Sequence, residues 1–151
     1  MNYLPKNLSF KEGIAYIGET SLVDVAKNYG TPLYVYDWEH LKGNIDAFTE
    51  AFGKDTLFRY AAKAFISKAL VKELDEKGWG IDVVSGGEMA TVQETVGTLE
   101  NTVFNGTFKR TDEIEYFIQN NGGHISIDNR YEIEMLEKAA SSLKKKQPVI
   151  M

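Results

Sequence analysis

The sequence of 151 residues contains no cysteine, which excludes disulfide bonds and thiolate metal sites. It also lacks any hydrophobic run approaching the length needed to cross a membrane, and its first thirteen residues hold no apolar signal segment. A membrane partner and secretion are therefore not expected. We expect a cytoplasmic protein.

Positive charge is in short supply, since 17 lysines and arginines face 22 aspartates and glutamates and the net charge is −5. A nucleic-acid partner is not expected, because such partners require a basic footprint. The one basic cluster, Lys144 to Lys146, falls in the last turn of a predicted helix. There we expect a solvated face that interacts favourably with the negative end of the helix dipole.

Histidine is also scarce. His40 and His124 stand far apart, with no metal-binding spacing around either, and we expect no metal site. The sequence has no G-x-S-x-G elbow, no phosphate-binding P-loop and no G-x-G-x-x-G fingerprint. These absences remove the usual signatures of serine hydrolases, nucleoside triphosphatases and dinucleotide-binding enzymes.

The amino-terminal third, residues 1–55, shows short elements of mixed type. After a polar lead-in over residues 1–13, the apolar pattern predicts strands at 14–18 and 33–37, each preceding a helix. Asp37 is a natural N-cap for the second helix, whose apolar face we expect to be core. The members of that face are Trp38, Leu41, Ile45, Phe48 and Phe52.

Residues 56–151 alternate regularly between strands and helices. We expect strands at 56–63, 80–84, 102–106, 124–128 and 148–151, with helices at 66–77, 86–96, 111–120 and 130–143. Nearly continuous apolar strands joined through helices are typical of a parallel sheet. An open doubly wound sheet and part of a (β/α)8 barrel both fit this pattern. A whole barrel takes roughly 250 residues, so we expect either a small open sheet or a fragment.

Polar residues gather at the carboxyl ends of four predicted strands, where parallel α/β folds carry their functional groups. These are Lys63, then Asp82 with 85–88, then 105–107, then 128–129. Lys63 has two interpretations: a side chain that reaches into solvent, or a desolvated amine able to attack a carbonyl and form a Schiff base.

The segment SGGE at 85–88 also allows two interpretations. Ser85 followed by Glu88 predicts a capping box at a helix start. The same start exposes N–H groups that attract phosphate or carboxylate. Asp82, an acid in the middle of an apolar strand, must face the barrel mouth, a partner or water.

Five segments together resemble the amino-terminal part of the diaminopimelate decarboxylase family, whose members are barrel-type pyridoxal phosphate (PLP) enzymes similar to alanine racemase. The segments are TPLYVYD, YAAKAF, GIDVVSGGE, FNGTFKRTDEIEYFI and HISIDNRYEIEML. The resemblance runs from about Gly13 to Met151, and its most specific part is YA-x-KA followed, nineteen residues after its lysine, by D-x-x-S-G-G-E.

The resemblance implies a fold class, a cofactor and a reaction. The fold would be α/β, the first part of a (β/α)8 barrel of the alanine-racemase-like PLP type, with about five parallel strands over residues 56–151. Lys63 would carry PLP as a Schiff base, with Asp82 near the lysine and Ser85 among the cofactor contacts. The reaction would be decarboxylation of meso-2,6-diaminopimelate, an amino-acid substrate, to L-lysine.

The same resemblance implies parts that this sequence does not contain. The family's ring-stacking histidine, glycine-rich phosphate loop, pyridine-pairing glutamate and carboxy-terminal β-domain would follow Met151, and the family's active site is completed in a homodimer. We therefore expect the isolated 151-residue chain to be inactive. Sister enzymes acting on ornithine, arginine or carboxynorspermidine share the lysine and much of the barrel, and they remain an alternative for the substrate.

Overall fold

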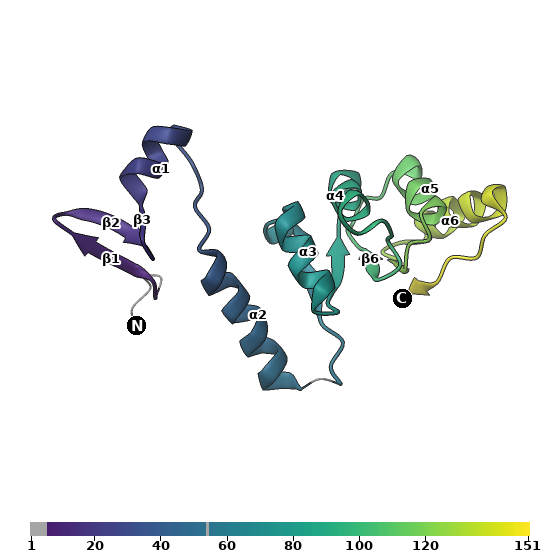
Figure 1. The fold of residues 1–151 in the computed structure, drawn as a ribbon. Helices are drawn as coiled ribbons and strands as arrows, with labels where there is room; N and C mark the ends of the chain where they lie inside the picture. The colour runs from purple at the N-terminus through teal and green to yellow at the C-terminus, as the bar shows by residue number, and fades with distance from the viewer. Residues whose placement is uncertain (1–5, 54) are drawn as a thin grey trace. The chain divides into compact units, whose positions relative to one another are not determined.

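The computed structural model describes residues 6–53 and 55–151. The chain divides into two compact units, Met1–Thr56 and Leu57–Met151, and each is described by itself (Figure 1).

The first unit opens with a three-stranded antiparallel sheet of β1 (Leu8–Lys11), β2 (Ile14–Ile17) and β3 (Thr20–Ser21). The expected polar lead-in is therefore wrong over residues 8–11, which pair with β2 as a hairpin. Helix α1 (Leu22–Tyr29) follows directly, and the hydroxyl of Ser21 caps it by accepting a hydrogen bond from the amide of Asp24 at 3.3 Å.

The predicted strand at residues 33–37 is also wrong. These residues adopt no regular structure, and Tyr34 is 92% exposed. A strand needs a hydrogen-bonded neighbour, and neither sheet of the described residues includes this segment. Its β-branched and aromatic residues favour a strand, but this preference is not sufficient when no neighbouring strand pairs with the segment.

Helix α2 (Trp38–Phe52) begins as predicted, with a carboxylate oxygen of Asp37 accepting from the amide of His40 at 3.1 Å. Its apolar face is not the expected core. Ile45 is buried, but Phe48 and Phe52 are 56% and 65% exposed and stack on each other. The helical spacing therefore identified a real apolar stripe, but more than half of the surface of these two side chains is exposed.

The second unit is a five-stranded parallel sheet with helices between successive strands. Its strands are β4 (Arg59–Ala61), β5 (Gly80–Val83), β6 (Thr102–Phe104), β7 (His124–Ser126) and β8 (Val149–Ile150). Its helices are α3 (Lys68–Glu76), α4 (Gly86–Val96), α5 (Thr111–Gln119) and α6 (Arg130–Leu143). All nine predicted elements of this unit are confirmed, with the strands shorter than expected.

The strand order decides between the two architectures that the sequence left open. The sheet runs β4-β5-β6-β7-β8, so each strand pairs with the next one along the chain. In a doubly wound sheet the order of the strands reverses at a switch point, and the order of these five strands does not reverse. Consecutive parallel strands added in one direction through βα units follow the strand order of a (β/α)8 barrel.

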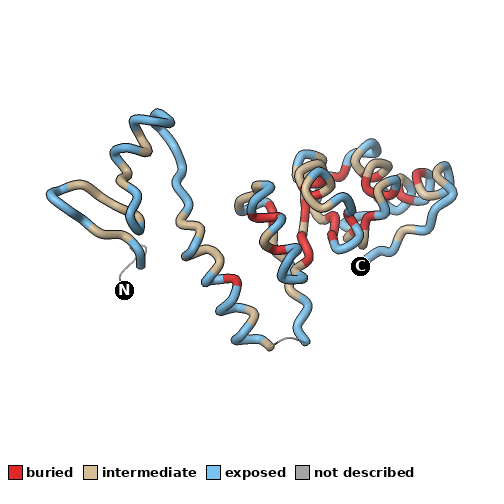
Figure 2. The backbone as a smooth tube through the Cα atoms, viewed as in Figure 1, coloured by how far each residue is buried: buried red, intermediate tan, exposed pale blue. Residues whose placement is uncertain are grey.

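The two faces of this sheet differ in character. Val83, Phe104 and Ile125 lie in one register row, are buried, and face the helices, where the ring of Phe104 lies 5.7 Å from that of Phe117. The helices contribute the buried residues Leu70, Val71, Leu74, Met89, Val92, Ile114, Ile118, Leu136 and Ala139. Figure 2 shows that most of the buried segments of the chain lie in this unit. Because side chains alternate along a strand, the opposite face carries the row Ala61, Asp82, Val103 and His124.

The basic cluster after α6 is more than a solvated face. The ammonium of Lys145 donates to the carbonyls of Ile118 and Gln119, at 3.2 and 2.9 Å, and to the side-chain oxygen of Asn121 at 2.8 Å. These carbonyls end α5, so Lys145 caps the carboxyl end of the neighbouring helix and not that of its own. Lys145 is exposed and lies at the negative end of a helix dipole, as expected, but that helix is α5.

Just before β7, the backbone at Gly123 lies too close to the neighbouring backbone to leave room for a side chain. A Cβ added to Gly123 would overlap the backbone oxygens of Glu100 and Thr102, and the amide of Gly123 donates to the carbonyl of Leu99 at 3.0 Å. Glycine is therefore required at position 123 by contact with backbone, which cannot rotate away as a side chain can.

We expect G123A to destabilise the second unit by about 1–3 kcal/mol, the usual cost of overpacking. For a unit of this size, each kcal/mol lowers the melting temperature by about 4–8 °C. G87A is the matched control, because a Cβ at Gly87 meets no atom within 4 Å. Thermal denaturation followed by circular dichroism measures both variants, and equal melting temperatures would contradict the steric argument.

Candidate functional site

Lys63 lies in a turn at the carboxyl end of β4. The strand ends at Ala61, and Ala62–Ala64 form a single 3-10 turn, so the predicted strand to residue 63 is too long. The hydroxyl of Tyr60 donates to the carbonyl of Phe65 at 2.8 Å and closes this turn. Lys63 is exposed. In this chain the amine is accessible to a ligand, and the alternative of a desolvated amine does not describe it.

Asp82 lies on the neighbouring strand, level with the residue that precedes this turn. It pairs in register with Ala61 of β4, and its side chain is half-buried on the face of the sheet away from the helices. Its Oδ1 atom is buried and has no hydrogen-bond partner among the described residues. A buried carboxylate oxygen without a partner is rare in folded proteins, and it gives this position an unused acceptor beside the lysine turn.

Ser85 caps α4, as predicted, by accepting a hydrogen bond from the amide of Glu88 at 3.3 Å. The other half of the capping box is shifted by one residue, since the carboxylate of Glu88 accepts from the amide of Val84 at 2.7 Å. The hydroxyl hydrogen of Ser85 remains available as a donor.

Glu113 is a residue that the sequence interpretation missed. One of its carboxylate oxygens accepts from the amide of Gly86 at 2.8 Å, and the other accepts from the amide of Arg110 at 3.1 Å. A single carboxylate therefore joins the starts of α4 and α5. The anion expected at the SGGE segment is supplied, at Gly86, by the chain itself.

The remaining two strand ends are ordered by their own side chains. The side-chain oxygen of Asn105 accepts from the amide of Gly106 at 2.9 Å, and that of Asn129 accepts from the amide of Glu132 at 3.0 Å. Asn129 is thus the N-cap of α6. In both predicted strand-end clusters the asparagine side chain therefore bonds to nearby backbone.

Lys109 and Glu132 form a buried ion pair that the sequence interpretation also missed. The ammonium lies 3.1 Å from a carboxylate oxygen, and the two side chains are 0% and 4% exposed. The spacing N-x-x-E from Asn129 to Glu132 predicts a helix start. No sequence pattern predicts that the side chain of Lys109 contacts Glu132.

An exposed ion pair at the start of α5 contrasts with this buried one. Arg110 donates to Asp112 through two nitrogens, and these hydrogen bonds lower the pKa of the Asp112 carboxyl and raise the pKa of the Arg110 guanidinium. Both groups lie on the surface, so solvent screens their attraction.

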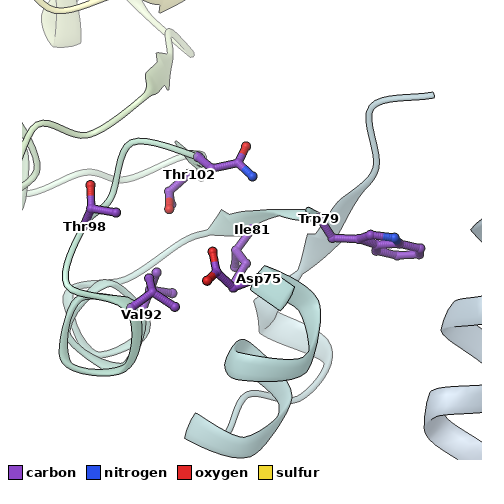
Figure 3. A pocket seen from close by; sticks show the side chains of 8 residues that line it. Asp75, Trp79, Ile81, Val92, Thr98 and Thr102 are labelled. Atoms are coloured by element: carbon purple, nitrogen blue, oxygen red, sulfur yellow. The ribbon is translucent and has the colours of Figure 1, made fainter. Parts of the chain in front are cut away.

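The cavity between α3 and α4 is not part of this site. It lies at the amino ends of β5 and β6, beside Trp79 and Thr102, and leaves room of about 20 Å³ (Figure 3). That space suits about one water molecule, and it lies at the end of the strands opposite Lys63.

The structure therefore brings Lys63, Asp82 and Ser85 to the same edge of the sheet, on two neighbouring strands. β6 lies two strand spacings from β4, roughly 10 Å. Asn105 and the buried ion pair extend the polar edge in that direction.

No helix of the described residues is long and apolar enough to cross a membrane.

The strand order and the lysine after the first strand are consistent with a barrel-type enzyme, and comparison of the sequence with known families identifies which one. Residues 39–151 match the family model described as pyridoxal-dependent decarboxylase, pyridoxal binding domain. The chain belongs to this family, and the predicted resemblance is confirmed.

Within the family, the chain is similar to curated proteins and solved structures named diaminopimelate decarboxylase. Curated diaminopimelate decarboxylases from Bacillus subtilis and Corynebacterium efficiens are 37% and 31% identical to the chain, over 84% and 97% of its length. The crystal structure of diaminopimelate decarboxylase from M. jannaschii in complex with L-lysine matches 95% of the chain with a TM-score of 0.82 and 29% identity. It confirms the partial barrel.

The chain spans about a third of the length of these relatives, 30% and 32% of the two curated proteins and 35% of the crystallised chain. The family model covers a pyridoxal-binding domain. The residues present fit that cofactor in one respect: an exposed lysine lies in the turn after β4, and the neighbouring strand carries a carboxylate oxygen without a hydrogen-bond partner among the described residues.

We expect E113A to lower the stability of the second unit by about 1–3 kcal/mol, because two backbone donors lose a charged acceptor. Hydrogen exchange at the Gly86 amide should accelerate, since its carboxylate partner is gone. E115A on the same helix is the control. Hydrogen exchange by NMR together with thermal denaturation tests this, and a Gly86 amide as slow in E113A as in the native protein would contradict the assignment.

Proposed function

We propose that Lys63 binds PLP covalently through its amine, with Asp82 and Ser85 as further cofactor-site residues. The observation that carries the proposal is the position of Lys63, exposed in a closed turn beside Asp82, within a chain of the pyridoxal-dependent family. Lysine amines are the groups that proteins use to hold this aldehyde.

In this proposal the chain's own residues orient the cofactor and hold charge. The Lys63 amine would hold PLP through a carbon–nitrogen double bond to its aldehyde carbon, whose oxygen would leave as water, and the turn closed by Tyr60 fixes the starting point of the lysine side chain. The unpartnered oxygen of Asp82 can accept a proton or a hydrogen bond from a group at Lys63. The Ser85 hydroxyl can donate to an anionic oxygen. PLP, when bound, supplies an electron sink for the electron pair released as CO2 leaves.

The reaction we propose for the intact protein is decarboxylation of meso-2,6-diaminopimelate to L-lysine. The names of the relatives support it, as does the L-lysine in a similar crystal structure. Because the chain covers about a third of those proteins, the isolated 151 residues are expected to show no turnover. A homodimeric assembly and a cytoplasmic location stay predictions.

The cofactor proposal is tested by trapping. The intact protein is incubated with PLP, reduced with borohydride and digested, and the adduct is located by mass spectrometry. We expect one dominant adduct, on Lys63, because that amine is presented beside an unpaired acid. K63A should lose it, and K68A, which alters an exposed lysine on α3, should keep it. Labelling scattered over surface lysines would argue against a site at Lys63.

The substrate proposal is tested separately by following CO2 release and the amino-acid product. The intact protein is expected to act on meso-2,6-diaminopimelate in preference to ornithine, arginine and carboxynorspermidine, and K63A is expected to be inactive. A preference for one of the other three substrates would replace the proposed substrate and leave the cofactor site standing. The isolated chain serves as the expected inactive comparison.

A further inference from the structure

The Lys109–Glu132 ion pair joins two loops at the carboxyl edge of the sheet. Lys109 lies in the loop between β6 and α5, and its ammonium donates to the carbonyl of Gly106 at 2.6 Å as well as to Glu132. Glu132 lies in the first turn of α6, and the same carboxylate oxygen accepts from the amide of Asp128 at 2.9 Å. The pair thus connects a backbone carbonyl after β6 to a backbone amide after β7.

The pair is deeply buried. The lysine and glutamate side chains are 0% and 4% exposed, and the ammonium lies 5.7 Å from the centre of the Phe104 ring. The second oxygen of Glu132, Oε1, is buried without a hydrogen-bond partner among the described residues. This oxygen has therefore lost its hydrogen bonds to water and has gained none from the described residues.

Stability does not explain such an arrangement well. Burying two charges costs several kcal/mol, and the attraction repays this only when the remaining hydrogen-bond sites are satisfied. Here one site is not. Apolar residues of similar size are often as stabilising as a buried ion pair, so the contribution of the pair is better sought in the geometry that it imposes.

That geometry belongs to the edge that carries Lys63 and Asp82. The loop after β6 follows the strand that pairs with β5, and β5 carries Asp82. Other hydrogen bonds in these loops stay within the loop or reach a different neighbour, such as those accepted by Asn105, Asn129 and Glu113. With the pair, movement of one loop requires movement of the other, because a single carboxylate oxygen accepts from both.

We propose that Lys109 and Glu132 are positioning residues, which lock the loops after β6 and β7 together and so fix the wall of the cofactor site. This inference rests on the proposed function. Neither residue is assigned contact with the cofactor or the substrate. Their effect is transmitted through the backbone of Gly106 and Asp128.

The test uses variants that separate position from stability. K109M/E132M in the intact protein replaces the pair with apolar side chains of similar length, and K109R retains the charge. K68M/E94M removes an exposed ion pair of 2.7 Å between α3 and α4 and is the matched control. Three quantities are measured: the melting temperature, the dissociation constant for PLP, and hydrogen exchange of backbone amides in both loops.

We expect K109M/E132M to melt close to the native protein but to bind PLP on the order of tenfold more weakly, since the site wall opens locally. K109R should restore most of the affinity, and K68M/E94M should change neither quantity. Native-like PLP affinity in the double variant overturns the proposal. So does a loss of affinity that simply follows the loss of melting temperature across the variants.

Exchange across the two loops tests the locking itself. E132Q alters only α6, yet it should accelerate exchange at the Gly106 amide in the other loop, and K109M should do the same at Asp128. This readout needs no cofactor and applies even if the double variant does not fold. If the native protein fails to bind PLP, the proposed function falls while the exchange result still decides on the lock. Independent exchange in the two loops overturns it.

Discussion

The start of each helix in a βα array presents backbone N–H groups that lack acceptors within the helix, and the carboxyl edge of this sheet is organised by how those groups are satisfied. Glu88, Glu113 and Glu132 each stand at the third position of a helix and accept from backbone amides near a helix start. Glu113 and Glu132 also reach across to a neighbouring βα unit. The loops after β5, β6 and β7 are therefore held by carboxylates from the helices that follow them.

This arrangement limits the groups at the carboxyl edge that are left for a ligand. The amide of Gly86 at the start of α4 is occupied by Glu113, and only groups outside this network remain free for a ligand. Lys63 and Asp82 are such groups, since neither belongs to a helix cap. The family's pyridoxal-binding domain covers both residues. The chemistry proposed for Lys63 and Asp82 thus involves side chains that do not cap helices at this edge.

The sequence predicted the second unit well because its signals were local. Strands and helices alternate with clear apolar periods, and Ser85 caps its helix as its spacing from Glu88 predicts. It could not predict features that depend on partners distant in sequence. The apolar segment at 33–37 is not a strand because no edge pairs with it, and Lys109 is buried because a glutamate 23 residues later meets it. Lys63 was placed in a strand that ends two residues earlier, where the alanines around it give little strand preference.

The depth of the Lys109–Glu132 pair has a consequence for the response of the protein to ionic strength. Dissolved ions screen charges that solvent reaches, with a screening length of about 8 Å at physiological salt, but they act much less on a buried pair. The exposed contact between Lys68 and Glu94 weakens as salt is added, whereas the attraction between Lys109 and Glu132 is largely shielded from it. The spacing of the two loops is thereby insulated from the ionic composition of the surrounding solution.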